Sequence, residues 1–169
     1  MTATKEHLTN MFEFVRWGDN LIMRAARSVP DEGYYREQGI SAGSIHKLLV
    51  HVMAAQWLWL SRWRGDSPTR IETHEDYPTR DALEQRWPLV HSAVLDFLSM
   101  QSPKSLARVL EYRNNKGEVC ALPLGDTVLQ VIDHSIYHRG QLNTMIKRAG
   151  GTPAPAGYVL YCFQKARTT

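Results

Sequence analysis

Apolar residues recur at every third or fourth position over four long stretches of the chain, and this spacing predicts amphipathic helices. The first helix is expected over residues 4–28, just ahead of a proline that stops it. The second is expected to begin at an N-cap serine, Ser44 or alternatively Ser41, and to run to about Trp63, before Gly65. Each stretch leaves an apolar stripe that must be buried against a neighbouring element.

The third helix is expected to begin near Thr79, after a polar linker that holds two prolines. Pro88 either kinks this helix or marks a later start. A short β-hairpin should follow, because polar and apolar residues alternate over residues 109–113 and an Asn-Asn-Lys-Gly turn leads into a second strand over residues 118–122.

The last long helix is expected to start near Asp126 or Thr127 and to end at the glycine pair 150–151, before a tail that is first proline-rich and then apolar. The four patterns together predict an all-α fold. It is a four-helix bundle with long connections and a short β-hairpin before the last long helix. The linkers suit long crossovers, or loops over one end of the bundle. We expect a single domain over residues 1–169.

Composition and charge narrow the function classes. Apolar residues make up 43% and charged residues 22% of the 169 positions, which is typical of a globular domain with one sizeable core. The formal net charge is only +3, and the densest basic cluster, residues 62–70, holds three arginines. A nucleic-acid-binding protein usually presents a longer basic stripe, so we expect no nucleic-acid partner.

The remaining sequence features bear on location and on cysteine chemistry. Cys120 and Cys162 lie far apart outside any CxxC motif, which argues against a disulfide framework and a thiolate zinc site. The chain carries no apolar run of the length of a signal peptide at its N-terminus, and no stretch long enough to span a bilayer. We therefore expect a cytoplasmic protein without a membrane partner.

Two histidines stand out within an otherwise apolar stretch of the last helix. His134 and His138 are four residues apart, so they project from one helix face, which also carries core-type residues such as Val131 and Leu142. The simplest alternative is that each is a core histidine satisfied by a hydrogen bond. A pair on one core-facing surface also suits a divalent cation, because two neighbouring imidazoles are difficult to protonate together and can both donate a lone pair.

A third ligand must come from another helix, and the second helix offers two histidines. His46 and His51 are five residues apart, so their side chains diverge by about 140° and cannot serve one ion together. His51 has small and apolar neighbours on its face, whereas His46 lies in the first turn and is expected to face outward. His51 is thus the better candidate. His7, His74 and His91 have polar surroundings and are expected at the surface or in loops.

The segment from His134 to Gln141 reads HSIYHRGQ and resembles the HxxxHRGQ signature of the DinB-like (YfiT-like) family of putative metalloenzymes. The second helix resembles that family's second helix, in which a histidine at the position of His51 is the first metal ligand. The FxxxRWxDN pattern in the first helix, residues 12–20, also resembles the Y..W.N..L opening of that family. This chain lacks the acidic residue expected in the tail before the final aromatic residues.

The resemblance implies a bundle that binds one divalent metal ion through His51, His134 and His138. It also implies relatives that include bacillithiol S-transferases and mycothiol-dependent isomerases, in which the metal activates a low-molecular-weight thiol, and a homodimer. Three neutral histidines leave an open coordination position, as in catalytic sites. Either a metal-held thiolate attacks an electrophilic carbon or a metal-activated water hydrolyses a substrate. Zinc, nickel and iron suit the ligands equally.

Four residues near the pair have expected roles of their own. Gln141 is expected to hydrogen-bond a ligand or the second nitrogen of a histidine, and Tyr137 to line the entrance, so both are candidate substrate-binding residues; no catalytic residue is assigned. Arg139 points away from the metal side and should anchor the helix through a carboxylate elsewhere. Gly140 is expected to permit close helix approach.

Three tryptophans within seven residues of the second helix cannot all face one core. At least one should line a pocket or meet a partner chain, and we expect a homodimer with Trp57 near its interface. The leading function is a metal-dependent thiol S-transferase or hydrolase that acts on a small molecule. The alternatives are a non-catalytic metal-binding or stress-response protein on the same fold, and a purely structural bundle whose core histidines are satisfied by hydrogen bonds.

Overall fold

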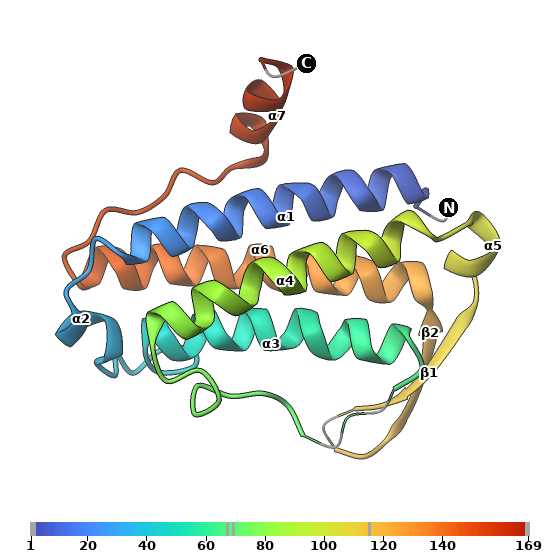
Figure 1. The fold of residues 1–169 in the computed structure, drawn as a ribbon, viewed down its shortest axis with the longest axis horizontal. Coiled ribbons are helices and arrows are strands. Elements are labelled where there is room, and N and C mark those ends of the chain that lie inside the picture. Colours follow the sequence, from blue (N-terminus) through green and yellow to red (C-terminus); the bar gives the residue numbers. More distant parts are fainter. Residues whose placement is uncertain (1–2, 67, 69, 115, 168–169) are drawn as a thin grey trace.

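Four long helices run side by side and form the body of the molecule (Figure 1). The computed structural model describes residues 3–66, 68, 70–114 and 116–167. The long helices are α1 (Lys5–Ala26), α3 (Ile45–Trp63), α4 (Arg80–Ser99) and α6 (Leu124–Arg148). The shorter elements are α2 (Asp31–Tyr35), α5 (Pro103–Leu106), α7 (Tyr158–Ala166) and the antiparallel hairpin β1 (Val109–Arg113) and β2 (Val119–Pro123). The predicted bundle with a hairpin before its last long helix is confirmed.

Hydroxyl side chains fix where three of the long helices begin. The side chains of Thr4, Ser44 and Thr79 each accept a hydrogen bond from a backbone N–H three residues later. Ser44 is therefore the N-cap of α3, and Ser41 is not. Pro88 lies inside α4 and does not mark a later start. Helix α6 begins slightly earlier than predicted, directly after the hairpin.

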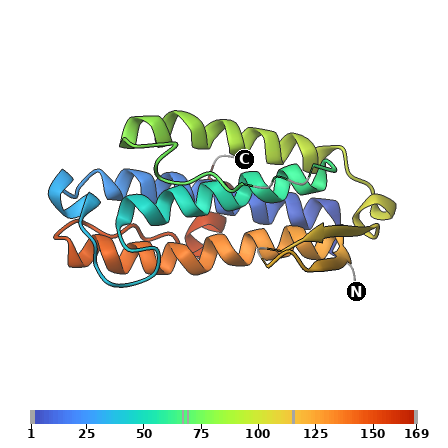
Figure 2. The same ribbon diagram turned by 90° about the horizontal axis from the view of Figure 1, so that it is seen from below.

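The order of the helices around the bundle explains the long linkers. Helix α1 packs against α6, α6 against α3, α3 against α4, and α4 against α1. Helices α1 and α3 are therefore diagonal neighbours, as are α4 and α6, and each diagonal step needs a long connection. The segment after α3 runs back along the bundle, so α3 and α4 point in the same direction (Figure 1). Figure 2 shows the hairpin extending at the α5 end of the bundle, where α6 begins.

A polar layer divides the core of the bundle into two apolar clusters. One cluster is built around residues such as Ile22, Leu49 and Met145, and the other around residues such as Phe12, Leu60 and Val128. Between them, each long helix contributes at least one buried polar side chain. These are Asp19 on α1, Gln56 on α3, His91 on α4, and Ser135 and Arg139 on α6. The layer lies at the middle of the bundle, at the level of His134 and His138 along α6.

The C-terminal tail is held against the bundle. The amide of Asn143 donates to the carbonyl of Ala154 and accepts from its N–H, each at 2.9 Å. Helix α7, which follows, was not predicted; its Tyr158 and Tyr161 rings pack on Phe14 of α1 at 5.1 and 5.6 Å between centroids. The apolar periodicity of this segment could have predicted the helix, although a stretch of nine residues gives only a short pattern. None of the helices that the structure describes is both long and apolar enough to cross a bilayer.

Candidate metal centre

The structure brings together the three histidines selected from the sequence. His51 comes from α3, whereas His134 and His138 lie one turn apart on α6, the helix packed beside it. Each offers one ligand nitrogen, and these nitrogens all lie within 4.8 Å of one another. The Nε2 atoms of His51 and His134 are 3.1 Å apart. Within the described part of the chain, this is the group of at least three potential ligands that comes close enough to hold one ion.

These distances fit a divalent cation. Zinc–nitrogen bonds of 2.0–2.1 Å in a tetrahedral site place two ligand nitrogens about 3.3 Å apart. The separation of 3.1 Å between His51 and His134 is already close to that value, and the 4.8 Å limit leaves only a small adjustment for the rest. The set contains three imidazoles and no thiolate or carboxylate, which suits zinc, nickel or iron and leaves at least one coordination position open.

The cluster lies at the side of the bundle and is less deeply buried than we predicted. His134 and His138 are half-buried, and His51 is the more exposed residue, although its ring packs against both of theirs. The side chains that point into the centre of the bundle from this part of α6 are those of Ser135 and Arg139. The prediction that the pair faces the interior away from water is therefore wrong in degree, because the apolar stripe of α6 lies beside the histidines. The consequence is a cluster that small molecules can reach.

Gln141 holds one ring of the cluster in a defined state. Its Oε1 lies 2.7 Å from Nδ1 of His138, and an amide oxygen only accepts, so Nδ1 carries the proton and Nε2 is left free to bind a cation. The same oxygen accepts from the hydroxyl of Ser41 at 2.8 Å. The Gln141 amide donates to the hydroxyl of Tyr137 at 3.0 Å. Tyr137 is 62% exposed and stands at the rim of the cluster, 5.1 Å from the His138 ring.

Partial burial changes the protonation of the cluster. Burial, together with the neighbouring His138 and His51 rings, lowers the pKa of His134 to about 4, and Asp19 opposes this shift. Burial and His138 also lower the pKa of His51. Burial lowers the pKa of His46, which lies elsewhere on α3. His51 and His134 are thus neutral at neutral pH, and this is the state that binds metal ions.

The stability of the metal-free protein should fall as the pH drops below about 6.5. The unfolded chain protonates its histidines near that pH, whereas folded His134 does so near pH 4, so acidification between the two favours unfolding. Over the full pH interval between these two pKa values, His134 lowers the free energy of unfolding by at most about 3 kcal/mol. Urea unfolding at about pH 7.5, 6.5 and 5.5, where carboxylates are still ionised, measures this loss. On acidification over this range, the His134→Gln variant should lose less stability than the unmodified protein. A urea midpoint of the unmodified protein that stays constant with pH would contradict the prediction.

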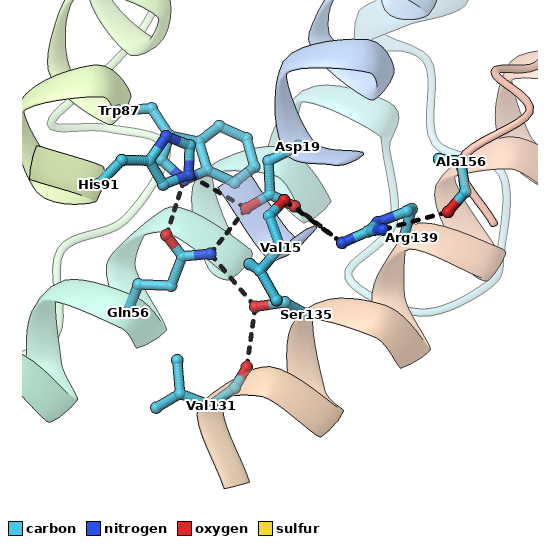
Figure 3. A network of polar contacts seen from close by, with 9 residues as sticks. All are labelled: Val15, Asp19, Gln56, Trp87, His91, Val131, Ser135, Arg139 and Ala156. Atoms are coloured by element: carbon cyan, nitrogen blue, oxygen red, sulfur yellow. Dashed lines mark hydrogen bonds and ion pairs between the residues drawn. The ribbon is translucent and has the colours of Figure 1, made fainter. Parts of the chain in front are cut away.

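A buried network of polar side chains lies at the centre of the bundle (Figure 3). Asp19 Oδ2 accepts from Gln56 Nε2 at 2.8 Å and from His91 Nε2 at 3.1 Å, and Asp19 Oδ1 lies 3.8 Å from the guanidinium of Arg139. The amide of Gln56 also donates to Ser135 at 3.2 Å. The Trp87 indole donates to Gln56 Oε1 at 2.8 Å. The network joins all four long helices and fixes α6 at the residues next to His134 and His138.

Two histidines that we expected at the surface are buried. His91 is 1% exposed and belongs to the network, because it shares the buried stripe of α4 with Trp87 and Val94. That helical spacing was a signal in the sequence. His46 is 3% exposed, and its ring nitrogens lie 3.1 Å from the Tyr34 hydroxyl and 2.8 Å from the Tyr77 carbonyl oxygen. Helix α2 and the segment before α4 cover it, and no local pattern indicated this.

Arg139 anchors α6 as predicted, through its buried ion pair with Asp19. Its guanidinium also donates to the carbonyls of Val15 and Ala156, which ties α6 to α1 and to the tail. The close approach assigned to Gly140 is wrong, since a Cβ there would meet nothing within 4 Å. Gly18 on α1 has that role, because a Cβ at this position would overlap the guanidinium of Arg139.

Comparisons with known proteins agree with this architecture. The sequence profile of the DinB family matches residues 1–168. Protein DinB of Bacillus subtilis (strain 168) is 24% identical over 158 residues, which cover 90% of this chain and 92% of that protein. The crystal structure of a DinB-like protein from Bacillus cereus ATCC 10987 shares the fold, with a TM-score of 0.65 at 18% identity over 90% of this chain and 97% of that one.

Proposed function

The chain belongs to the DinB family, and from this membership we propose that it binds one divalent metal ion through His51, His134 and His138 and uses it to activate a small molecule. The observation that carries the proposal is the convergence of three imidazoles from two helices within 4.8 Å. His51, His134 and His138 are neutral ligands that would leave such an ion its full charge and an open position, where a bound thiol or water would become more acidic.

The chain's own residues support a reactive site in two ways. Gln141 fixes the tautomer and orientation of His138 through the hydrogen bond at Nδ1. Tyr137 and Gln141 stand at the rim, where their hydroxyl and amide groups can contact a bound molecule, and we assign them to substrate binding. A thiol S-transferase and a hydrolase both fit this arrangement. The resemblance to thiol-dependent relatives favours the transferase with a low-molecular-weight thiol as cosubstrate.

Metal analysis and activity screening test the proposal in sequence. Protein purified without chelator should contain close to one equivalent of zinc, nickel or iron per chain, measured by mass spectrometry of the elements. The metal-loaded protein should then consume a low-molecular-weight thiol in the presence of an electrophilic substrate. Stoichiometric metal without activity towards any thiol or hydrolysable ester would favour the non-catalytic metal-binding alternative. Absence of metal after loading would leave only a structural bundle.

Removal of the Gln141 amide should weaken metal binding by about 10- to 100-fold, the usual effect of losing a partner that orients a ligand histidine. Gln141→Leu removes the acceptor for His138 Nδ1, whereas Gln141→Glu retains one. Competition titration against a chromogenic chelator should therefore find a clear loss of affinity in the leucine variant and a smaller loss or none in the glutamate variant. Equal affinities for Gln141→Leu and the unmodified protein would exclude this orienting role.

A homodimer is the second part of the proposal, based on the family resemblance. Within one chain, Trp57 packs on both apolar clusters, and the Arg86 guanidinium lies 4.4 Å from its ring, while its half-buried side chain is still partly accessible. Gel filtration at micromolar concentration should give the mass of two chains, and Trp57→Ala should shift it towards one. A monomer in the unmodified protein would contradict the dimer without affecting the metal site.

A further inference from the structure

A cavity of about 380 Å³ opens beside the histidine cluster, between α3, the hairpin and α6. His51 and His134 form part of its wall. The remaining lining residues are Ala55, Leu58, Trp59, Arg62, Ile71, Tyr112, Asn114 and Lys116. Its volume is that of a small-molecule site, and its wall combines apolar and aromatic side chains with two cations.

The lining residues of α3 follow a single face of the helix away from the metal cluster. His51, Ala55, Leu58, Trp59 and Arg62 are spaced three or four residues apart, or adjacent on one flank. Because a helix rises 1.5 Å per residue, Arg62 starts about 16 Å further along the axis than His51. A molecule that contacts both groups must therefore be elongated, with an apolar middle portion next to Leu58 and Trp59.

Arg62 is held in place by neutral groups. Its guanidinium carbon lies 4.9 Å from the Trp59 ring centroid and 4.8 Å from that of Tyr112, and its Nη2 donates to the Arg113 carbonyl at 2.9 Å. Among the described residues, no carboxylate lies within ion-pair distance of it, whereas Arg27, Arg70, Arg80 and Arg86 each have one. Arg62 is half-buried and still charged, so it offers its remaining N–H groups to the cavity.

We propose that this cavity binds an elongated anionic molecule, whose carboxylate or phosphate group pairs with Arg62 and Lys116 while its other end reaches the histidine cluster. The planar guanidinium suits a bidentate contact with either anion, and its contacts with the Trp59 and Tyr112 rings orient it in advance. The apolar portion of the molecule packs against Trp59 and Leu58. This inference names the substrate class of the proposed function and rests on that function only for what happens at the histidines.

Binding to the metal-free protein tests the anion site separately from the metal site. The probes are 4-phenylbutyrate, 4-phenylbutyl phosphate and the uncharged 4-phenyl-1-butanol, titrated by calorimetry into full-length protein stripped with chelator and dialysed. At least one charged probe should bind tenfold or more tightly than the alcohol, and the tighter of the two identifies the anion. Equal binding of all three probes, or no binding of either anion, would overturn the proposal.

Matched variants locate the anion. Arg62→Gln should abolish the preference for the charged probe, whereas Arg64→Gln, which removes an exposed arginine two residues away, should leave it unchanged. Lys116 lies in an exposed turn, so Lys116→Gln should leave the bundle folded. This variant should reduce the preference for the charged probe severalfold. A preference unaffected by both Arg62→Gln and Lys116→Gln would refute this site. Charge preference in a protein that takes up no metal would reject the proposed function and retain the anion site. Metal uptake without any charge preference would retain the proposed function and reject the anion site.

Discussion

Replacing His138 by alanine should remove stoichiometric metal from the protein while the bundle stays folded. The variant loses one of three ligand nitrogens, so we expect affinity for the ion to fall by more than about 100-fold, the upper end of what is lost when only a ligand's partner is removed. The half-buried ring lies outside both apolar clusters, so its removal should change the free energy of unfolding of the metal-free protein by less than about 1 kcal/mol.

Elemental analysis and thermal unfolding of the same preparation separate these two effects. His7→Ala is the matched control, because His7 is an exposed histidine at the start of α1, away from the cluster. That variant should retain one equivalent of metal, and both variants should unfold at nearly the same temperature once stripped of metal. Unchanged metal content in His138→Ala would refute the ligand assignment. A His138→Ala protein that is unfolded without metal would instead assign His138 to the support of the fold.

The second large effect is expected at the centre of the bundle. Asp19→Ala should lower the free energy of unfolding by about 3–5 kcal/mol, because it leaves the buried guanidinium of Arg139 without a counter-charge. Gln56 and His91 lose an acceptor at the same time. For a chain of this size, that loss corresponds to a fall in the melting temperature of roughly 6–20 °C.

Two further variants decide whether the cause is charge burial. Asp133→Ala removes an exposed aspartate from α6 and should change stability by less than about 0.5 kcal/mol. Arg139→Met combined with Asp19→Ala should be less unstable than the sum of the single changes, because the double variant buries no unpaired charge. A loss below about 1 kcal/mol in Asp19→Ala, measured by chemical denaturation, would show that the ion pair contributes little.

The long helices and the grouping of the three histidines were predictable because both depend on local spacing. The period of apolar residues predicted the four long helices, and the hydroxyl residues Thr4, Ser44 and Thr79 stand at the starts of three of them. The pairing of His134 with His138 follows from helical geometry alone. His51 was preferred over His46 because of its neighbours on the helix, and the structure places its ring within reach of the other two.

The polar layer was missed because its members come from four different helices. Asp19, Gln56 and His91 each lie on an apolar stripe, and a single polar residue there can be satisfied only by a partner that the local pattern does not reveal. His91 in particular has its neighbours Val90 and Val94 on the buried face. Its position relative to those residues was more informative than the polar residues beside it in the sequence.

The walls of the cavity depended on packing between distant segments. Arg62 and Trp59 lie three residues apart on one face of α3, but the Tyr112 ring that contacts both belongs to the hairpin. Likewise, His46 is covered by Tyr34 and Tyr77 from two separate connections. Hydrophobic periodicity describes individual elements and carries little information on which loop folds over which helix end.

The contact between Gly18 and Arg139 has a consequence for how such proteins diverge. A methyl group at position 18 would occupy the space of the guanidinium, so these two positions, 121 residues apart in the chain, should be replaced together during evolution. A homologue with a larger residue at the first position is expected to carry a shorter side chain at the second, and to lose with it the bridge from α6 to the tail. Steric exclusion at one glycine thereby couples α1 to α6 and to the tail segment at Ala156.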